Sequence, residues 1–367
     1  MGFESVRTYN FRNLADTEIE VSSPRVFLVG ENGQGKTNFL ETIYVLCYGA
    51  SFRTRRDERL CREGADRLKL LGRLTDPRGE RHEIVYGWGG GKKTIRLNGK
   101  SLVDRKDLVF ILPCIIFAHD DIEFVYGAPE RQRFFFDQTL SLYDPLFIDV
   151  LRNYRRILRE RNAALKQGRL DLLDVYDRRL AEAGCEMLAK RREAVSAFNE
   201  TFSRLFSRVS GFEEPMHIEY RPSWRLKEGS ADTEAAIEQL YRRRERDRVM
   251  TTTTSGPHRD RFIFRYRGAD FTETASTGQL RLVSLILRVA QAGFFASRSG
   301  RRPVLLLDDV LLELDPLRRA RFLEALPSYE QAFFTFLPDE RFTDYAAGDT
   351  LIYRVRGGTI MPYGTGG

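Results

Sequence analysis

Paired cysteines and long apolar runs are both missing from this chain of 367 residues. The four cysteines are scattered and form no C-x-x-C pair, which argues against a zinc site and against a disulfide framework. No stretch of 18 apolar residues occurs, so the sequence predicts no transmembrane helix. The first residues, MGFESVRTYNF, lack the basic-then-apolar layout of a signal peptide. We therefore expect a cytoplasmic, reducing environment and no membrane partner.

Basic residues exceed acidic ones, which gives a net charge of +7 and a pI near 9.2. Much of the excess is arginine, and arginine pairs bidentately with phosphate, so a nucleic-acid backbone is a reasonable partner. The alternative is a solvated surface of mixed charge, because 52 acidic residues are also present. The arginine clusters are Arg53/Arg55/Arg56, Arg155/Arg156/Arg159/Arg161 and Arg242/Arg243/Arg244/Arg246/Arg248.

Residues 27–41 read FLVGENGQGKTNFLE, and this stretch carries the first functional motif. The apolar run at 26–29 predicts a buried strand, and the residues from Lys36 onward predict a helix. The glycines between them allow a tight loop whose backbone N–H groups converge on an anion. Phosphate is also favoured at the N-terminus of the following helix. The alternative is a glycine-rich turn without a ligand.

The spacing Gly30-x-x-x-x-Gly35-Lys36-Thr37 matches the P-loop of nucleotide-binding proteins. Lys36 should reach the β- and γ-phosphates, and Thr37 should ligate Mg²⁺. We therefore predict that the stretch binds ATP together with Mg²⁺. The predicted nucleotide-binding residues are Gly30, Asn32, Gly33, Gln34, Gly35, Lys36, Thr37 and Asn38.

A second motif, VLLLDD at 304–309, is an apolar strand that ends in two carboxylates. A carboxylate at the end of a buried strand beside a P-loop can hold Mg²⁺ directly or through water, and we assign this role to Asp308. Asp309 is then placed to polarise the attacking water. We therefore predict that Asp309 and Lys36 are the catalytic residues. The alternative for Asp309 is that it caps the next helix.

A third motif, ASTGQ at 275–279, precedes the helical run 280–294. Ser276 can cap this helix, and Gly278 allows close approach of a backbone or ligand. A phosphate could also lie at this helix N-terminus. Because the chain already has its phosphate cradle at 33–37, a second one makes most sense if it serves the nucleotide of another copy. The motif therefore predicts a head-to-head dimer with two shared ATP molecules.

The rest of the chain alternates between strand and helix patterns. Short strands are expected at 6–9, 26–29, 68–74, 83–88, 94–97, 111–117, 218–220 and 262–266. Apolar residues at steps of three and four from Leu173 to Val209, interrupted by Arg191, predict a long helix. With an earlier helix and a break at Gly168, this helix makes either a hairpin arm or an ordinary helical subdomain. A charged helix is expected around 235–248, and the tract Thr251–Thr254 is interpreted as a linker.

The order P-loop, serine-led helix and acid-ended strand with a nearby Leu-Asp is that of the ABC-type ATPases. In detail the sequence resembles the RecF family of bacterial DNA replication and repair proteins, which are compact relatives of the SMC heads. The matching stretches are YNFRNL (9–14), GENGQGKTNFLE (30–41), SFRTRRDERL (51–60), IIFAHDDIEFVYGAPERQRFFFD (115–137), SGPHRDRFIF (255–264), ASTGQLRLVSL (275–285) and LLLDDVLLELD (305–315).

This resemblance implies an α/β fold, an ABC-type P-loop ATPase head with an inserted, mainly helical second lobe. The expected parts are 1–118 for the N-terminal part of lobe I, 119–275 for lobe II with its helical arm, and 276–367 for the signature helix and the C-terminal part of lobe I. Arg12 and Asn13 in YNFRN would lie near the nucleotide. Ser276 and Gly278, with Gln279 of the same signature, would contact ATP across the dimer.

The resemblance also implies a function in recombinational repair and replication. Such proteins bind DNA, dimerise on ATP and hydrolyse it slowly. They act with the mediator proteins RecO and RecR at gapped DNA, where they help RecA load onto single strands coated by SSB. A cytoplasmic, nucleoid-associated location follows from that role. Hydrolysis could serve mainly to reset a nucleotide-dependent assembly switch.

Some positions depart from the family pattern. His119 and Asp120 stand where Pro and Glu are usual, and Thr277 stands where Arg is more frequent. The switch position after the last core strand resembles Thr335 in FFTFLPDE, whereas ABC transporters have His there. An ATP-binding subunit of an ABC transporter is the alternative from another class. That class usually has a far shorter segment between the lobe-joining loop and the signature than the roughly 150 residues found here.

Overall fold

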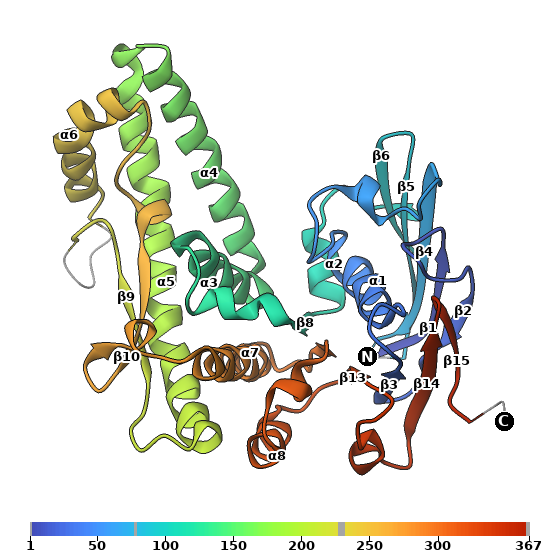
Figure 1. The fold of residues 1–367 in the computed structure, drawn as a ribbon. Coiled ribbons are helices and arrows are strands. Elements are labelled where there is room, and N and C mark those ends of the chain that lie inside the picture. The colour runs from blue at the N-terminus through green and yellow to red at the C-terminus, as the bar shows by residue number, and fades with distance from the viewer. Residues whose placement is uncertain (1, 77–78, 227–231, 365–367) are drawn as a thin grey trace. The chain divides into compact units, whose positions relative to one another are not determined.

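The computed structural model describes residues 2–76, 79–226 and 232–364. The chain divides into two compact units, which are drawn in Figure 1. Unit 1 comprises Met1–His119 and Phe295–Gly367, and unit 2 comprises Asp120–Phe294. The second boundary falls inside helix α7 (Thr277–Ser299), whereas the sequence placed a boundary just before that helix. The three-part division of the chain stays a prediction.

The first sheet of unit 1 is antiparallel, with the strand order β2-β1-β4-β5-β6-β7. Its long strands alternate between buried and exposed residues, so one face is apolar and packs into the core. The strands are β1 (Gly2–Tyr9), β2 (Glu18–Glu20), β4 (Arg67–Thr75), β5 (Arg81–Gly89), β6 (Lys92–Leu97) and β7 (Lys100–Ser101).

The second sheet of unit 1 has the order β15-β14-β3-β13-β12-β8 and is parallel except for the β14–β15 hairpin. Its central strands β3, β13 and β12 and its edge strand β8 are buried almost throughout, as expected for strands covered on both faces. The strands are β3 (Arg25–Val29), β8 (Cys114–Phe117), β12 (Val304–Leu307), β13 (Gln331–Phe336), β14 (Thr350–Arg356) and β15 (Thr359–Pro362).

Helix α1 (Lys36–Tyr48) lies between the two sheets, and most of its residues are buried. Its side chains join one apolar core with residues of both sheets. The predicted strand at 111–117 is shorter than expected, because α2 (Lys106–Ile111) ends at Ile111 and β8 begins only at Cys114. The remaining helix that lies wholly in the described part of unit 1 is α8 (Pro316–Ala325).

Unit 2 is mainly helical, with a small sheet of order β11-β10-β9. The break at Gly168 is confirmed, since this residue has a φ of 68° and lies between helices α4 (Pro145–Lys166) and α5 (Leu173–Ser210). These helices pack side by side (Figure 1) and also contact α6 and α3, so they form the core of a helical subdomain. The elements of unit 2 are α3 (Pro129–Tyr143), α4 (Pro145–Lys166), α5 (Leu173–Ser210), α6 (Thr233–Met250), β9 (His217–Arg221), β10 (Arg261–Tyr266) and β11 (Ala269–Asp270).

Short 3₁₀ helices occur in both units, at Asp57–Leu60, His119–Phe124, Leu170–Leu172, Pro257–Arg259, Phe271–Glu273, Val310–Glu313 and Phe342–Tyr345.

The interpretation of Thr251–Thr254 as a linker is wrong. Thr253 is fully buried, and its hydroxyl accepts a hydrogen bond of 2.8 Å from the guanidinium of Arg161. The hydroxyl and the backbone N–H of Thr254 both donate to the carboxylate of Asp247. The tract is therefore part of the polar core of unit 2 from Thr253 onward, while Thr251 is exposed.

Among the described residues, one helix is long and apolar enough, by length and composition, to cross a membrane. This helix is α7, and 78% of its most apolar window is buried inside the protein. Its apolar side chains therefore belong to the packed interior.

Candidate nucleotide site

The loop after β3 needs glycine at three positions. A Cβ at Gly30 would lie 2.4 Å from the carbonyl oxygen of Val355, so a side chain does not fit there. Gly33 and Gly35 have φ values of 77° and 116°, in the left-handed region that favours glycine. Helix α1 starts immediately after Gly35. The chain thus forms the strand, loop and helix that the motif predicts.

Lys36 is the cation of this loop, and its side chain is only 3% exposed. Its Nζ donates a hydrogen bond of 2.7 Å to the carbonyl of Gly30. The same nitrogen lies 3.7 Å from Oδ1 of Asp309 at the end of β12. The two motifs that are far apart in sequence therefore meet at the carboxyl edge of the parallel sheet, where such sheets bind ligands.

Thr37 and Asp308 form the second link between the two motifs. The Thr37 hydroxyl donates a hydrogen bond of 2.8 Å to Oδ1 of Asp308. Burial raises the pKa of Asp308 to about 6, which shows that its negative charge lacks full compensation. A hydroxyl and a buried carboxylate are hard oxygen donors of the kind that Mg²⁺ prefers, so these residues fit a magnesium site.

Asp309 has a φ of 53°, a conformation that is unusual for a residue other than glycine. Its side chain makes no capping hydrogen bond to the 3₁₀ turn that follows, so the capping alternative is wrong. The Thr335 hydroxyl donates to Asp309 Oδ1 at 2.7 Å and accepts from the Asp309 N–H at 2.7 Å. The side chain is thereby held near Lys36, and a third of it is exposed.

Of the two residues assigned from the YNFRN stretch, Asn13 lies directly on the loop. Its Nδ2 donates to the carbonyl of Gly33 at 3.3 Å, and its Oδ1 accepts from Nδ2 of Asn38 at 2.7 Å. Arg12 instead makes a bidentate ion pair with the buried carboxylate of Glu41, at 2.9 and 3.0 Å. It is 22% exposed, so part of its guanidinium remains accessible.

The sequence analysis missed two supports of the loop. Arg53, named there only within a basic cluster, donates to Oδ1 of Asn38 at 2.7 Å, and its charge acts to lower the pKa of Asp308. The turn Gly357-Gly358 between β14 and β15 donates two backbone hydrogen bonds to Gln34, one to its side chain and one to its carbonyl. The stretch SFRTRRDERL could have indicated that Arg53 lies near the loop. No local sequence signal marks the turn Gly357-Gly358 as a support of the loop.

Ser276, Gly278 and Gln279 lie at the start of α7, in unit 2. The Gln279 side chain accepts from the Ser276 N–H at 2.8 Å, and the Ser276 hydroxyl accepts from the Gln279 N–H at 3.3 Å. This reciprocal pair is a capping box, so the prediction that Ser276 caps the helix is confirmed. Ser276 and Gly278 are exposed, as is Asn32 in the loop of unit 1.

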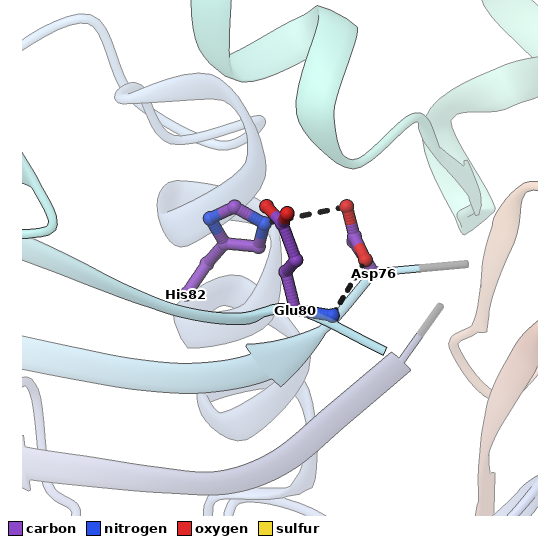
Figure 2. Close-up of side chains that lie close together, drawn as sticks. All are labelled: Asp76, Glu80 and His82. Carbon is purple, nitrogen blue, oxygen red and sulfur yellow. Dashed lines mark hydrogen bonds and ion pairs between the residues drawn. The ribbon is translucent and has the colours of Figure 1, made fainter. Parts of the chain in front are cut away.

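A separate group of possible metal ligands is formed by Asp76, Glu80 and His82 (Figure 2). The side-chain carbonyl of Asn98 accepts from the Glu83 N–H, so its NH₂ group faces His82 Nδ1 at 3.1 Å. This contact leaves the proton on Nε2, which faces Asp76 at 3.5 Å. The geometry therefore favours a histidine–carboxylate contact over a metal ligand.

Comparison with known proteins agrees with this geometry. A family model described as the RecF/RecN/SMC N terminal domain matches residues 3–355. The DNA replication and repair protein RecF of Treponema pallidum (strain Nichols) is 44% identical over 95% of this chain and 98% of its own length. RecF of Anaeromyxobacter sp. (strain Fw109-5) is 37% identical over 98% of both chains.

Solved structures give the same result. A structure of the recombination mediator protein RecF with ATP, in the RecFOR pathway, has a TM-score of 0.89 and 28% identity over 98% of this chain and 97% of that one. An SMC head has a TM-score of 0.58 at 16% identity over 99% of this chain and 98% of that one, which reflects the shared fold alone. The transporter alternative is thereby set aside. The chain has the fold of an ABC-type ATPase head and belongs to the RecF family of DNA replication and repair proteins.

Proposed function

We propose that the protein is an ATP-dependent DNA-binding switch of recombinational repair and replication, with slow ATP hydrolysis. The observation that carries this proposal is the convergence of Lys36, Thr37, Asp308 and Asp309 within hydrogen-bond or ion-pair distance. The solved RecF structure with ATP supports the choice of nucleotide.

Each side chain in this group has a distinct role in the proposal. Lys36 leaves the Gly30 carbonyl to neutralise the β- and γ-phosphates, while the N–H groups of the loop hold the phosphate oxygens. Thr37 and Asp308 would hold Mg²⁺, which supplies charge neutralisation at the phosphates. Asp309 accepts a proton from, or orients, the attacking water, with Thr335 fixing its carboxylate.

We also propose that two copies share two nucleotides. The P-loop of one copy holds the phosphates, and Ser276, Gly278 and Gln279 of the other copy complete the site. The exposed capping box and the absence of any Cβ contact at Gly278 among the described residues support this assignment, since a phosphate needs such close access.

The DNA partner and the mediator proteins complete the proposal. We place the protein at gapped DNA, where it acts with RecO and RecR to help RecA load. The net charge of +7 and the names of the relatives support a DNA role. A cytoplasmic, nucleoid-associated location is part of the same proposal.

Size-exclusion chromatography with light scattering, with and without ATP, tests the switch. We expect a dimer only with ATP, and we expect short gapped or blunt-ended DNA to join the dimer. Lys36→Met should abolish dimerisation, because losing charge-assisted bonds to phosphate costs about 1.5–3 kcal/mol per bond. Lys166→Met, on an exposed residue of α4, is the control. Unchanged nucleotide affinity in Lys36→Met would contradict the proposal.

A further inference from the structure

The outer face of the antiparallel sheet in unit 1 is exposed and basic. Cross-strand pairing aligns Arg7 with Leu71, Val85 and Arg96 in one row. The next row places Lys69 between Tyr9 and Gly87, and a third row ends at Lys92. At about 4.8 Å between strands, Arg7 and Arg96 are about 14 Å apart at Cα.

Four cations on this face are unpaired. Their side chains are exposed and have no hydrogen-bond or ion-pair partner among the described residues; they are Arg7, Lys69, Lys92 and Arg96. Two carboxylates lie near these cations. Glu18 is the cross-strand neighbour of Arg7, and Glu83 lines the groove in the middle of the face. Both point instead to Arg73, at 2.8 Å from Glu18 and 3.7 Å from Glu83. The four cations therefore give the face a net positive charge.

The middle of the face is hollow. A groove of about 450 Å³ is lined by Lys69, Lys92, Thr94 and Arg96, and Gly87 and Gly89 leave its floor without side chains. A Cβ at Gly87 would lie 2.8 Å from the Thr94 hydroxyl, so a side chain there would disturb the neighbouring strand. The groove thus brings the cations to the rim of a smooth depression.

The spread of these charges favours a polyanion over a single phosphate. One DNA strand carries a phosphate every 3.4 Å along its axis, so about 14 Å accommodates about four of them. Binding of single strands relies on aromatic side chains that stack on bases. Tyr9 on β1 is 48% exposed and stands open beside these cations, whereas Trp88 in the lining of the groove is partly buried against the core. One such ring is a poor stacking platform, so the chemistry of the face fits a duplex backbone.

The other prominent basic surface is much better compensated. On helix α6, Arg242 pairs with Glu238, Arg248 pairs with Glu245, and Arg244 pairs with acidic residues of α5. Only Arg243 and Arg246 of that run lack a side-chain partner among the described residues. The sequence alone gives α6 the densest arginine cluster, but the structure leaves more unpaired charge on the sheet.

We propose that the outer sheet face, defined by Arg7, Lys69, Lys92 and Arg96, binds the sugar-phosphate backbone of duplex DNA. This inference rests on the proposed DNA-binding function and names the surface that performs it. Each cation neutralises one phosphate and releases counterions, so affinity on this face depends steeply on salt.

The test compares two full-length variants that each lose three positive charges. One is Lys69→Gln/Lys92→Gln/Arg96→Gln on the sheet, and the other is Arg242→Gln/Arg243→Gln/Arg246→Gln on α6. Affinity for a short blunt-ended duplex and for its single strand is measured over a range of salt with ATP present, and thermal unfolding verifies that each variant is folded.

We expect the sheet variant to bind duplex at least about tenfold more weakly, with a log–log salt slope shallower by about 2–3, and the α6 variant to bind as the wild type does. A charge-preserving variant, Lys69→Arg/Lys92→Arg/Arg96→Lys, should bind normally. Wild-type affinity in the sheet variant, an equal loss in the α6 variant, or a loss confined to single strands would overturn the inference. If the wild-type protein binds no DNA, the proposed function itself fails, which is a different outcome.

Discussion

Thr37 and Asp308 are 271 positions apart in the chain, yet the hydroxyl of one donates to the carboxylate of the other at 2.8 Å. Thr37 is the second residue of α1, just after the glycine loop, and Asp308 follows β12 of the adjoining parallel sheet. Burial of Asp308 raises its pKa to about 6, so the carboxylate is held in a place where its charge is costly without a cation. This pair ties the two halves of the nucleotide site together.

Replacing Asp309 by asparagine should separate nucleotide-driven assembly from hydrolysis. An amide cannot take a proton from water, and removal of such a base costs about 10²–10⁴-fold in rate. The side-chain amide of Asp309→Asn keeps an oxygen that can accept from Thr335, so we expect the site to retain its shape. Light scattering with ATP should show a persistent dimer of this variant. A monomer with ATP bound would contradict this prediction.

Thr335 should influence turnover through Asp309. Its hydroxyl makes two hydrogen bonds of 2.7 Å to that residue, one to the side chain and one to the backbone. Thr335→Val keeps the shape but removes both, and each is worth about 0.5–1.5 kcal/mol. We expect the hydrolysis rate to fall about 5- to 150-fold while ATP affinity stays nearly constant.

Thr335→Ser is the matched control, because it retains the hydroxyl, and its rate should stay close to that of the wild type. A loss of ATP affinity equal to the loss of rate in Thr335→Val would mean that Thr335 acts on binding. A defect in the serine variant with a normal rate in the valine variant would point to packing of the buried methyl group instead.

The sequence predicted the site residues well where each lies in a short motif that directly follows a strand. The two motifs, with Lys36 and Thr37 in one and Asp308 and Asp309 in the other, follow strands of a single parallel sheet, and the carboxyl ends of such strands meet at one edge. The partners of these residues were harder to foresee. The turn Gly357-Gly358 supports Gln34 from more than 300 positions away, and its sequence resembles any hairpin turn.

The helical unit shows the same limit. Arg191 interrupts the apolar stripe of α5 and, taken alone, reads as an exposed residue. It is 1% exposed because the carboxylates of Asp137 and Asp260 lie within 3.0 Å of its guanidinium. The Thr251–Thr254 tract is polar in composition, as linkers are, but Arg161 and Asp247 satisfy its hydroxyls inside the core. Such compensation depends on the tertiary fold and has no local signal.

Removal of the buried arginine of α4 should destabilise unit 2 strongly. Arg161 is fully buried and lies 2.7 Å from a carboxylate oxygen of Asp177 and 2.7 Å from one of Asp247. Arg161→Met leaves buried negative charge without its partner, and breaking such a pair costs about 3–5 kcal/mol. Urea unfolding followed by the fluorescence of Trp224, in a Trp88→Phe background, measures the change in this unit.

Arg156→Met on the same helix is the control. Arg156 is half exposed and lies 3.5 Å from Glu160, and such surface pairs contribute about 0–1 kcal/mol. Equal stability of the two variants would show that the buried cluster of Arg161 contributes no more than a surface pair.

The stability of unit 2 should fall as the pH drops below neutrality, and His258 should cause part of the fall. Its Nδ1 contacts the Tyr154 hydroxyl at 2.7 Å, and its Nε2 lies 3.0 Å from the carbonyl of Thr253. Burial lowers the pKa of His258 to about 4, although the bond to the Thr253 carbonyl acts in the opposite direction. The unfolded chain has the ordinary pKa of about 6.5 and binds a proton first.

Between pH 6.5 and 4 the unfolded state therefore gains a proton that the folded state does not bind. The contribution of His258 to the free energy of unfolding is thus complete above pH 6.5 and is lost as the pH falls toward 4. It amounts to at most about 3 kcal/mol, at 1.36 kcal/mol for each pH unit. His258→Gln can still donate to the Thr253 carbonyl but does not titrate. The difference in unfolding free energy between wild type and this variant, read from Trp224 in the Trp88→Phe background, should therefore change over this pH range. A difference that is constant from pH 7 to 4 would mean that the imidazole is protonated as easily in the folded protein as in water.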